Sequence, residues 1–248
     1  MHTRKSMSAA TQTRITFTSG EYQLNGSLHR PPGAGPCPLV IGCHGLMATA
    51  ASPKQIALAK RLSTLGIAYF RFDHRGCGSS EGDLHTATSF AGRCEDLKSA
   101  ARTLLGRPEL RRPLGLFGSS FGGAVCLDCA PALKPAAMVT LAAPIASTAI
   151  AAEAVSDLLT SEPHPGALDR HGLHFNLTDH IAEISHLLVI HGSADAVVPF
   201  ENAVGIHATA QAPKKLLTLE NGDHRVSTPE HQELFLNSAA DWLQSIIR

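Results

Sequence analysis

Short apolar runs alternate with longer segments of helical periodicity along most of the chain. Strands are predicted at short, mostly apolar runs, which are residues 39–43, 67–72, 114–117, 137–141, 187–191 and 215–219. The run at 39–43 is continuously apolar, as expected for a strand covered on both faces. Helices are predicted between or after these strands, at residues 53–65, 90–105, 121–130, 201–210 and 229–247. Such alternation is typical of an α/β protein with a mostly parallel sheet flanked by helices.

Two segments depart from this alternation. Residues 14–19 and 22–29 have strand character and are separated only by a turn, so we expect an antiparallel pair at the start of the sheet. Residues 144–185 predict a helix over 145–159 and are then rich in Pro, Gly and His. A plain connection is rarely so long, so we expect a short cap insertion over about residues 145–182. The whole chain, residues 1–248, is expected to form a single domain.

The composition narrows the class of partner. The chain is 44% hydrophobic and 17% charged, and its 21 Lys and Arg balance its 21 Asp and Glu. This zero net charge disfavours nucleic acid and anionic membranes, and no apolar run approaches the ~20 residues of a membrane span. Residues 1–14 are basic and polar without a hydrophobic export segment, so we expect a cytoplasmic protein. Its partner should be a small molecule, and its state a monomer or a homodimer.

The first candidate for chemistry is the sequence Gly-Ser-Ser-Phe-Gly at residues 118–122. It fits G-x-S-x-G and stands between a predicted strand and a predicted helix, which is the context that this motif requires. Glycines allow strand and helix to approach at the sharp turn, which lifts the hydroxyl of Ser120 clear of the sheet. Ser120 is therefore the predicted nucleophile.

A serine hydroxyl needs a base and a carboxylate behind it. His224 follows the last predicted strand and Asp195 the strand before it, so both should reach the sheet edge where Ser120 emerges. His44 and His191 end strands at the same edge and are rival bases, but each precedes a glycine and suits a tight turn.

Other aspartates compete with Asp195 as the carboxylate. Asp223 is adjacent to His224, and neighbours in sequence rarely face each other. Asp128 lies on the helix after Ser120 and is read as a solvated or capping group. Asp73 stands in a polar turn, residues 73–78, which we interpret as stapled by a buried ion pair.

Acyl transfer also requires donors for the developing oxyanion. We expect one from the backbone amide of Phe121, directly after the nucleophile. The second is expected from the amide of Leu46, in the turn Cys43-His44-Gly45-Leu46 that follows the strand at 39–43.

These motifs, in this order along the chain, resemble the α/β-hydrolase superfamily. The segment 72–82 resembles small bacterial esterases, monoacylglycerol-lipase-like enzymes and serine-aminopeptidase-like hydrolases. The resemblance implies an α/β-hydrolase fold with an eight-stranded sheet, and a serine esterase acting on a small-molecule ester. Ser119 is a departure, because many relatives have histidine there. This residue leaves the nucleophile unchanged but weakens any transfer of substrate specificity.

Several alternatives to a carboxylic ester hydrolase stay open. A thioesterase or small-amide hydrolase would use the same three residues, and a non-catalytic binding protein of this fold would use none of them. Peptidase activity is disfavoured because no large gating domain is evident, and dehalogenase chemistry would need an aspartate in place of Ser120. Apolar residues of the insertion are expected to line the substrate pocket, namely Leu158, Leu159, Leu168, Leu173 and Phe175.

No metal or cofactor is expected. The six cysteines are read as free thiols, and the C-x-x-C formed by Cys126 and Cys129 has no second pair at zinc-site spacing. The histidines of the insertion, at positions 164, 171, 174 and 180, also lack regular ligand spacing.

Overall fold

A computed structural model describes residues 10–33, 35–150 and 171–248. Eight strands lie within the described residues, in the bounds β1 Thr11–Ser19, β2 Tyr22–Arg30, β3 Cys37–Cys43, β4 Ala68–Phe72, β5 Leu110–Ser119, β6 Ala137–Leu141, β7 Leu187–Gly192 and β8 Lys214–Leu219. They form one sheet in the order β1-β2-β4-β3-β5-β6-β7-β8. β2 runs antiparallel to both of its neighbours, whereas the six strands β3 to β8 all run parallel to their neighbours among themselves. This confirms the predicted mostly parallel, eight-stranded sheet.

Among the strands, the observed and predicted bounds differ most for β5, which begins at Leu110 rather than at residue 114. Residues 110–113 have a weak strand pattern because they include Pro113, and proline cannot donate to a sheet ladder. The structure places it where the pairing with β3 is irregular, between the Pro38–Arg111 and Leu39–Leu114 pairs. The irregularity lets the strand continue past the proline.

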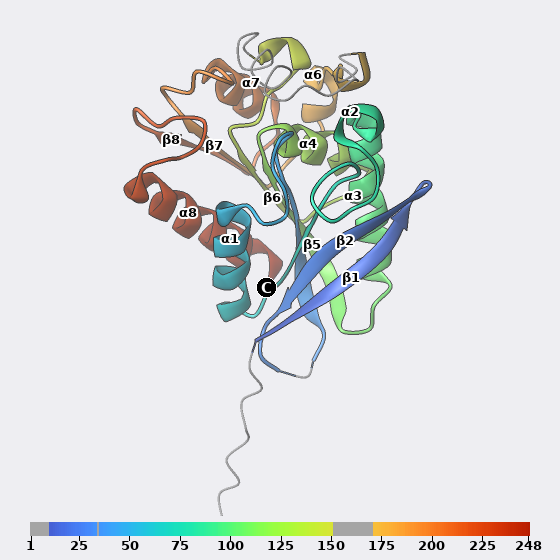
Figure 1. Cartoon of the computed structure of the whole chain (residues 1–248). Coiled ribbons are helices and arrows are strands. Elements are labelled where there is room, and N and C mark those ends of the chain that lie inside the picture. The colour runs from blue at the N-terminus through green and yellow to red at the C-terminus, as the bar shows by residue number, and fades with distance from the viewer. Residues whose placement is uncertain (1–9, 34, 151–170) are drawn as a thin grey trace, which may run out of the picture.

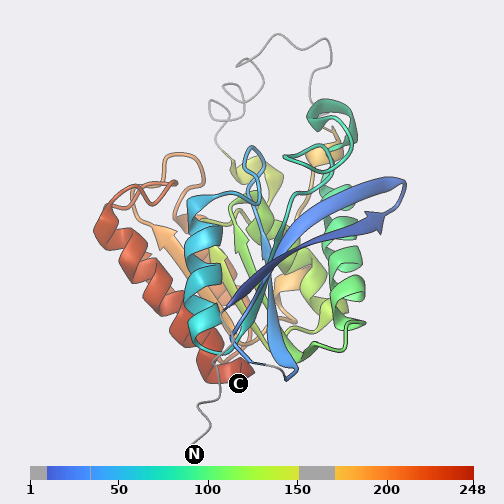
Figure 2. The ribbon, with the colours of Figure 1, turned by 60° about the horizontal axis from the view of Figure 1, so that its bottom comes forward.

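Helices cover both faces of the sheet (Figures 1 and 2). Their bounds are α1 Pro53–Thr64, α2 Leu84–Ala87, α3 Phe90–Leu105, α4 Phe121–Leu133, α6 Thr178–Ile181, α7 Glu201–Thr209 and α8 Pro229–Ile247. One apolar cluster joins α1 and α8 to one face of the sheet, and a second joins α3, α4 and α7 to the other. Two short helices, α2 and α6, were not predicted from the sequence.

The insertion leaves the sheet after β6 and returns beside its own start. The Ser147 amide donates to the Phe175 carbonyl at 3.0 Å and the Leu177 amide to the Ile145 carbonyl at 3.0 Å. The described residues before 151 form a 3-10 turn, Ser147–Ala149, instead of the start of the α-helix expected over 145–159, and the rest of that helix lies outside the described residues. A second 3-10 turn, His171–Leu173, precedes the returning limb.

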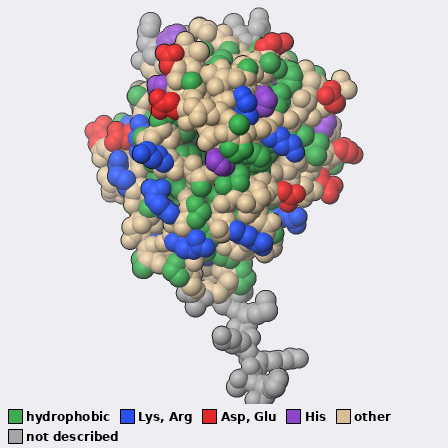
Figure 3. Space-filling model, turned by 180° about the vertical axis from the view of Figure 1, so that it is seen from behind, with side chains coloured by type: hydrophobic (Ala, Val, Ile, Leu, Met, Phe, Trp, Pro, Cys, Tyr) green, Lys and Arg blue, Asp and Glu red, His purple; other side chains and the backbone are tan. Residues whose placement is uncertain are grey.

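The surface carries both basic and acidic side chains, in keeping with the zero net charge. On the face seen in Figure 3, Lys and Arg side chains are spread over the middle and lower part, with Asp and Glu mainly toward the margins. Hydrophobic side chains lie between them. None of the helices in the described part of the chain combines the length and the apolar character needed to cross a membrane.

Candidate active site

Ser120 sits at a strained turn between β5 and α4. Its backbone has φ 54° and ψ −126°, a conformation that non-glycine residues rarely adopt. The flanking glycines explain how the turn fits. A Cβ at Gly118 would lie 2.3 Å from the Gly122 carbonyl oxygen, and one at Gly122 would lie 2.4 Å from the Cys43 carbonyl oxygen. The turn therefore requires glycine at both positions, as the G-x-S-x-G reading predicted.

The loops after β7 and β8 bring Asp195 and His224 to this turn. The distance from His224 Nε2 to Ser120 Oγ is 3.0 Å, and that from His224 Nδ1 to Asp195 Oδ2 is 2.8 Å. With a proton on Nδ1, His224 donates to the carboxylate and accepts from the Ser120 hydroxyl, which is the tautomer that a general base needs. The structure thus brings together the three side chains predicted to act as nucleophile, base and acid.

Asp195 is held as a carboxylate by several donors. Its Oδ1 accepts from the amides of Val197 at 2.9 Å and Val198 at 2.8 Å. Burial acts to raise the pKa of Asp195, but hydrogen bonds from His191 and His224 outweigh it and hold that pKa well below its ordinary value. The carboxylate is therefore ionised near neutral pH and can stabilise a protonated His224.

The rival histidines have other positions. His191 is fully buried, and its Nε2 lies 2.8 Å from the Val198 carbonyl oxygen and 3.2 Å from Asp195 Oδ2. It therefore contacts the same carboxylate oxygen of Asp195 as His224 does. His44 is also buried, and its ring bridges the Gly45 carbonyl oxygen at 2.8 Å and the His74 amide at 3.2 Å. Neither ring is hydrogen-bonded to Ser120.

The rival aspartates also lie elsewhere. Asp223 accepts from the Ser227 amide at 2.8 Å, and Asp128 pairs with the ring of His180 at 3.0 Å. Asp73 accepts from the amides of Ala50 at 2.7 Å and Ser79 at 3.0 Å, so it ties two loops together.

The buried ion pair expected in the turn at 73–78 is present, but its carboxylate comes from a different element. Arg75 pairs with Asp96 of α3 at 2.7 Å. Because residues 75 and 96 are distant in sequence, no local pattern pointed to this partner.

The predicted oxyanion donors flank the serine. A Cβ built on Gly45 would lie 3.4 Å from the Ser120 Cβ, so the turn at 44–46 passes directly beside the nucleophile. The amide of Phe121 is the first of α4, where helical amides have no intrahelical acceptor. Neither it nor the Leu46 amide donates to an acceptor among the described residues.

Arg93 of α3 holds this turn in place and was not singled out from the sequence. Its side chain is fully buried and donates to the carbonyl oxygens of Gly45 at 3.2 Å and Leu46 at 2.8 Å. The Gly45 carbonyl and the Leu46 N–H belong to one planar trans peptide, so they point in opposite directions. Fixing the carbonyl with Arg93 and His44 therefore fixes the direction of the Leu46 N–H.

Of the residues predicted to line a substrate pocket, Phe175 is the clearest to locate. Its ring stacks on Phe90 at a centroid distance of 4.4 Å and meets the ring of Phe121 at 5.6 Å. The returning limb of the insertion thus packs against the residue that follows the nucleophile. Leu173 is packed against the same apolar cluster. Leu158, Leu159 and Leu168 lie outside the described residues.

The sheet order and the serine turn place the molecule in the α/β-hydrolase class. The chain belongs to the family described as serine aminopeptidase, S33, whose model matches residues 34–165, just over half of the chain. It is 30% identical over 187 residues to the uncharacterized protein YfhR of Escherichia coli (strain K12), an alignment that covers 72% of this chain and 61% of YfhR. The chain therefore spans about three fifths of the length of that relative.

Two further similarities extend over nearly the whole chain. The mitochondrial palmitoyl-protein thioesterase ABHD10 of Bos taurus is 24% identical over 266 residues, covering 95% of this chain and 82% of that protein. The solved esterase domain of a Rhodothermus marinus protein superposes with a TM-score of 0.72 at 24% identity, covering 95% of this chain and 99% of that domain. At this level of identity the second similarity concerns the fold.

Proposed function

We propose that this chain is a carboxylic ester hydrolase that forms an acyl-enzyme on Ser120. The observation that carries the proposal is the continuous chain of hydrogen bonds from Ser120 Oγ through the ring of His224 to Asp195, at 3.0 and 2.8 Å. Membership of a hydrolase family supports it, since that family is defined over the part of the chain that includes Ser120.

In the first half of the proposed reaction, Ser120 Oγ attacks the ester carbonyl carbon while His224 Nε2 removes the hydroxyl proton. The carbonyl oxygen becomes an oxyanion, which the amides of Leu46 and Phe121 are placed to bind. As the tetrahedral intermediate collapses, the bond to the alcohol oxygen breaks and His224 returns the proton to the departing alcohol. The acyl group then remains on Ser120.

In the second half, water attacks the acyl carbon and gives a proton to His224. Collapse of this second intermediate breaks the bond to Ser120 Oγ, which takes the proton back, and the carboxylic acid leaves. Asp195 stays ionised throughout and stabilises the imidazolium form of His224 in both halves.

Labelling with a fluorophosphonate probe tests the nucleophile. The native chain should react covalently, and Ser120→Ala should not. Asp223→Asn is a matched control, because Asp223 neighbours His224 but its carboxylate accepts hydrogen bonds only from Ser227 among the described residues. It should label like the native chain. A native chain that resists the probe, or an alanine variant that labels equally, refutes the acyl-enzyme. The chain would then be a non-catalytic protein of this fold.

A thioesterase is the second candidate, because the relative that aligns with 95% of this chain is a palmitoyl-protein thioesterase. The same three side chains would cleave either bond. Values of kcat/KM for p-nitrophenyl esters, S-acyl thioesters and aminoacyl anilides of matched acyl groups decide between the readings. We expect the highest value for the oxygen ester, and a preference of more than about tenfold for the thioester or the anilide would replace the ester assignment.

A further inference from the structure

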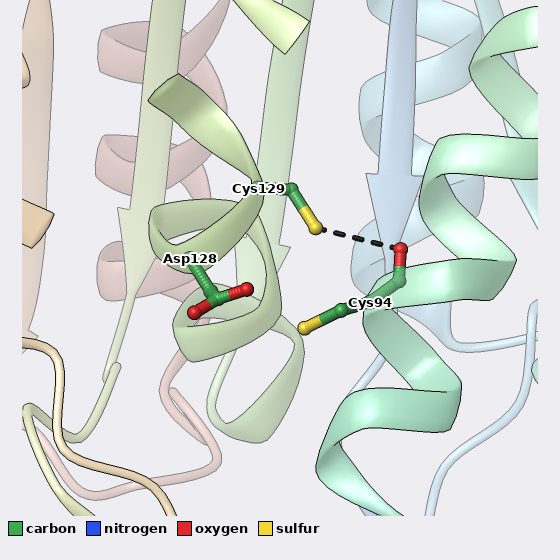
Figure 4. A group of neighbouring side chains, drawn as sticks. All are labelled: Cys94, Asp128 and Cys129. Atoms are coloured by element: carbon green, nitrogen blue, oxygen red, sulfur yellow. Dashed lines mark hydrogen bonds between the residues drawn. The ribbon is translucent and has the colours of Figure 1, made fainter. Parts of the chain in front are cut away.

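Two cysteines and an aspartate converge between α3 and α4, away from the proposed active site. Cys94 comes from α3, and Asp128 and Cys129 come from α4. One ligand atom from each, the two sulfurs and a carboxylate oxygen, all lie within 4.8 Å of one another. Figure 4 shows the Cys94 and Cys129 side chains directed toward each other's helix, with the Asp128 carboxylate beside them on α4. The Cys129 thiol donates to the Cys94 carbonyl oxygen at 3.5 Å. Asp128 is about 12 Å along α4 from Ser120 at the rise of a regular helix.

These donors are those that thiophilic cations prefer. In zinc sites, metal–sulfur distances are about 2.3 Å and metal–carboxylate distances about 2.0–2.2 Å, with tetrahedral geometry. Two sulfurs around such an ion stand about 3.8 Å apart by that geometry. The two sulfurs of Cys94 and Cys129 lie within 4.8 Å of each other, so they would have to approach by at most about 1 Å. Changes in side-chain torsions can provide this without moving either helix.

The carboxylate of this group has the surroundings of a metal ligand. His180 of α6 contacts it, with Nδ1 3.0 Å from Asp128 Oδ1. Metal-binding carboxylates are commonly oriented by such an outer partner. The side chain of Asp128 is 20% exposed and that of His180 is 49% exposed, so the carboxylate side of the group faces solvent.

A reactive thiol is a poor alternative for the cysteines. Cys94 is 3% exposed and Cys129 is fully buried, so neither is accessible to a protein or glutathione thiol. Simple core packing, in turn, would not require a carboxylate beside two buried sulfurs.

We propose that Cys94, Asp128 and Cys129 bind a thiophilic divalent cation of the Zn²⁺ class, which ties α3 to α4. The C-x-x-C at 126–129 gave no sign of this site, because Cys126 is not part of it. Its Sγ is directed to the Phe117 carbonyl oxygen at 3.6 Å instead. The second sulfur comes from another helix, which only the fold brings close.

Titration of the reduced, metal-free full chain with Co²⁺ tests the site. The native chain should show a near-ultraviolet thiolate-to-cobalt absorption that saturates at one ion per chain and is displaced by Zn²⁺. Cys94→Ser and Cys129→Ser should each lose it. Cys126→Ser is the matched control, since this cysteine is also buried on α4, and it should keep the absorption. His180→Gln should weaken binding by about 10- to 100-fold.

The outcomes separate this site from other sites on the chain. Cobalt absorption without the thiolate band would mean that surface histidines bind the ion, and it overturns the proposal. Retention of the band in both Cys94→Ser and Cys129→Ser overturns it as well. If the serine variants do not fold, Asp128→Asn keeps both sulfurs, and Zn²⁺ should then raise its Tm less than that of the native chain. Equal shifts in Tm refute the site.

Ser120→Ala lacks the proposed nucleophile but retains all three proposed metal ligands, so it should bind Co²⁺ like the native chain. The result is therefore independent of the proposed esterase activity.

Discussion

Replacing Arg93 by methionine tests whether a buried cation sets the direction of an oxyanion donor. The guanidinium makes no ion pair with a carboxylate in the described part of the chain. Besides the carbonyls of Gly45 and Leu46, it contacts Cys77 Sγ at 3.2 Å and lies 5.4 Å from the centre of the Phe121 ring. Burial lowers the pKa of Arg93, so the chain keeps a charge there at an energetic cost.

The size of the effect follows from the peptide that Arg93 holds. Complete loss of one oxyanion donor costs about 10²–10³ in kcat. His44 still holds the Gly45 carbonyl at 2.8 Å when Arg93 is gone, so the Leu46 N–H should be misdirected for part of the time. We therefore expect Arg93→Met to lower kcat by about 10- to 100-fold, with KM changed by less than about threefold. Arg93→Lys can bond one carbonyl and should fall in between.

The assay is steady-state hydrolysis of a p-nitrophenyl ester, with urea unfolding to confirm that each variant is folded. Arg102→Met is the control, because Arg102 is also on α3 but its side chain donates only to Ser99 among the described residues, at 2.8 Å. It should keep native kcat. A folded Arg93→Met with native kcat would show that the turn holds its shape without the guanidinium. A rise in KM alone would assign Arg93 to substrate binding.

Three further predictions concern Asp195, its hydrogen-bond partner His191, and His44 in the oxyanion turn. Asp195→Asn should keep the fold and lose about 10⁴ in kcat, and near-native turnover would place the acid elsewhere. His191→Leu removes a donor from Asp195, so the pKa of Asp195 should rise toward its ordinary value in a carboxyl titration followed by NMR; an unchanged pKa would contradict the contact at 3.2 Å. Burial, then repulsion from His74 and Arg93, holds the pKa of His44 well below its ordinary value, so the unfolded chain takes up a proton that the folded chain refuses. Stability should therefore fall as the pH drops below about 6.5, by up to about 1.4 kcal/mol per pH unit. Urea unfolding of His44→Gln should show a flatter dependence, and a slope equal to the native one would exclude His44 as the cause.

The features that could be predicted from the sequence are those that depend on local patterns. Buried parallel strands are mostly apolar, so β3, β4, β6 and β7 were evident. The turn at Ser120 was evident because its glycines are required by close backbone approach. Asp195 and His224 could be placed because parallel strands end at one edge, so loops that follow them converge without any contact having to be inferred.

Contacts between distant segments could not be predicted in this way. Asp96, the partner of Arg75, and Cys94, the partner of Cys129, both come from α3, and no spacing relates them to their partners. Arg93 did leave a signal. It follows Phe90 by three residues and precedes Leu97 by four, so it stands on the apolar face of α3, and all three side chains are buried. A charged residue at a core position of a helix is a candidate for a specific role.

Polar side chains from other elements form hydrogen bonds to the loops of the proposed site. A turn at a sheet edge has few backbone hydrogen bonds of its own, so its carbonyls need donors from elsewhere. Arg93 supplies them to the turn at 44–46, His191 faces Asp195, and Lys54 Nζ donates to the Arg225 carbonyl directly after His224, at 2.9 Å. Arg93 and His191 are buried at a cost that an apolar side chain would not carry, and each of the three groups fixes a peptide or carboxylate in a loop that carries the proposed site. Substitutions at these three positions should therefore lower turnover more than they lower stability, whereas apolar core substitutions should do the reverse.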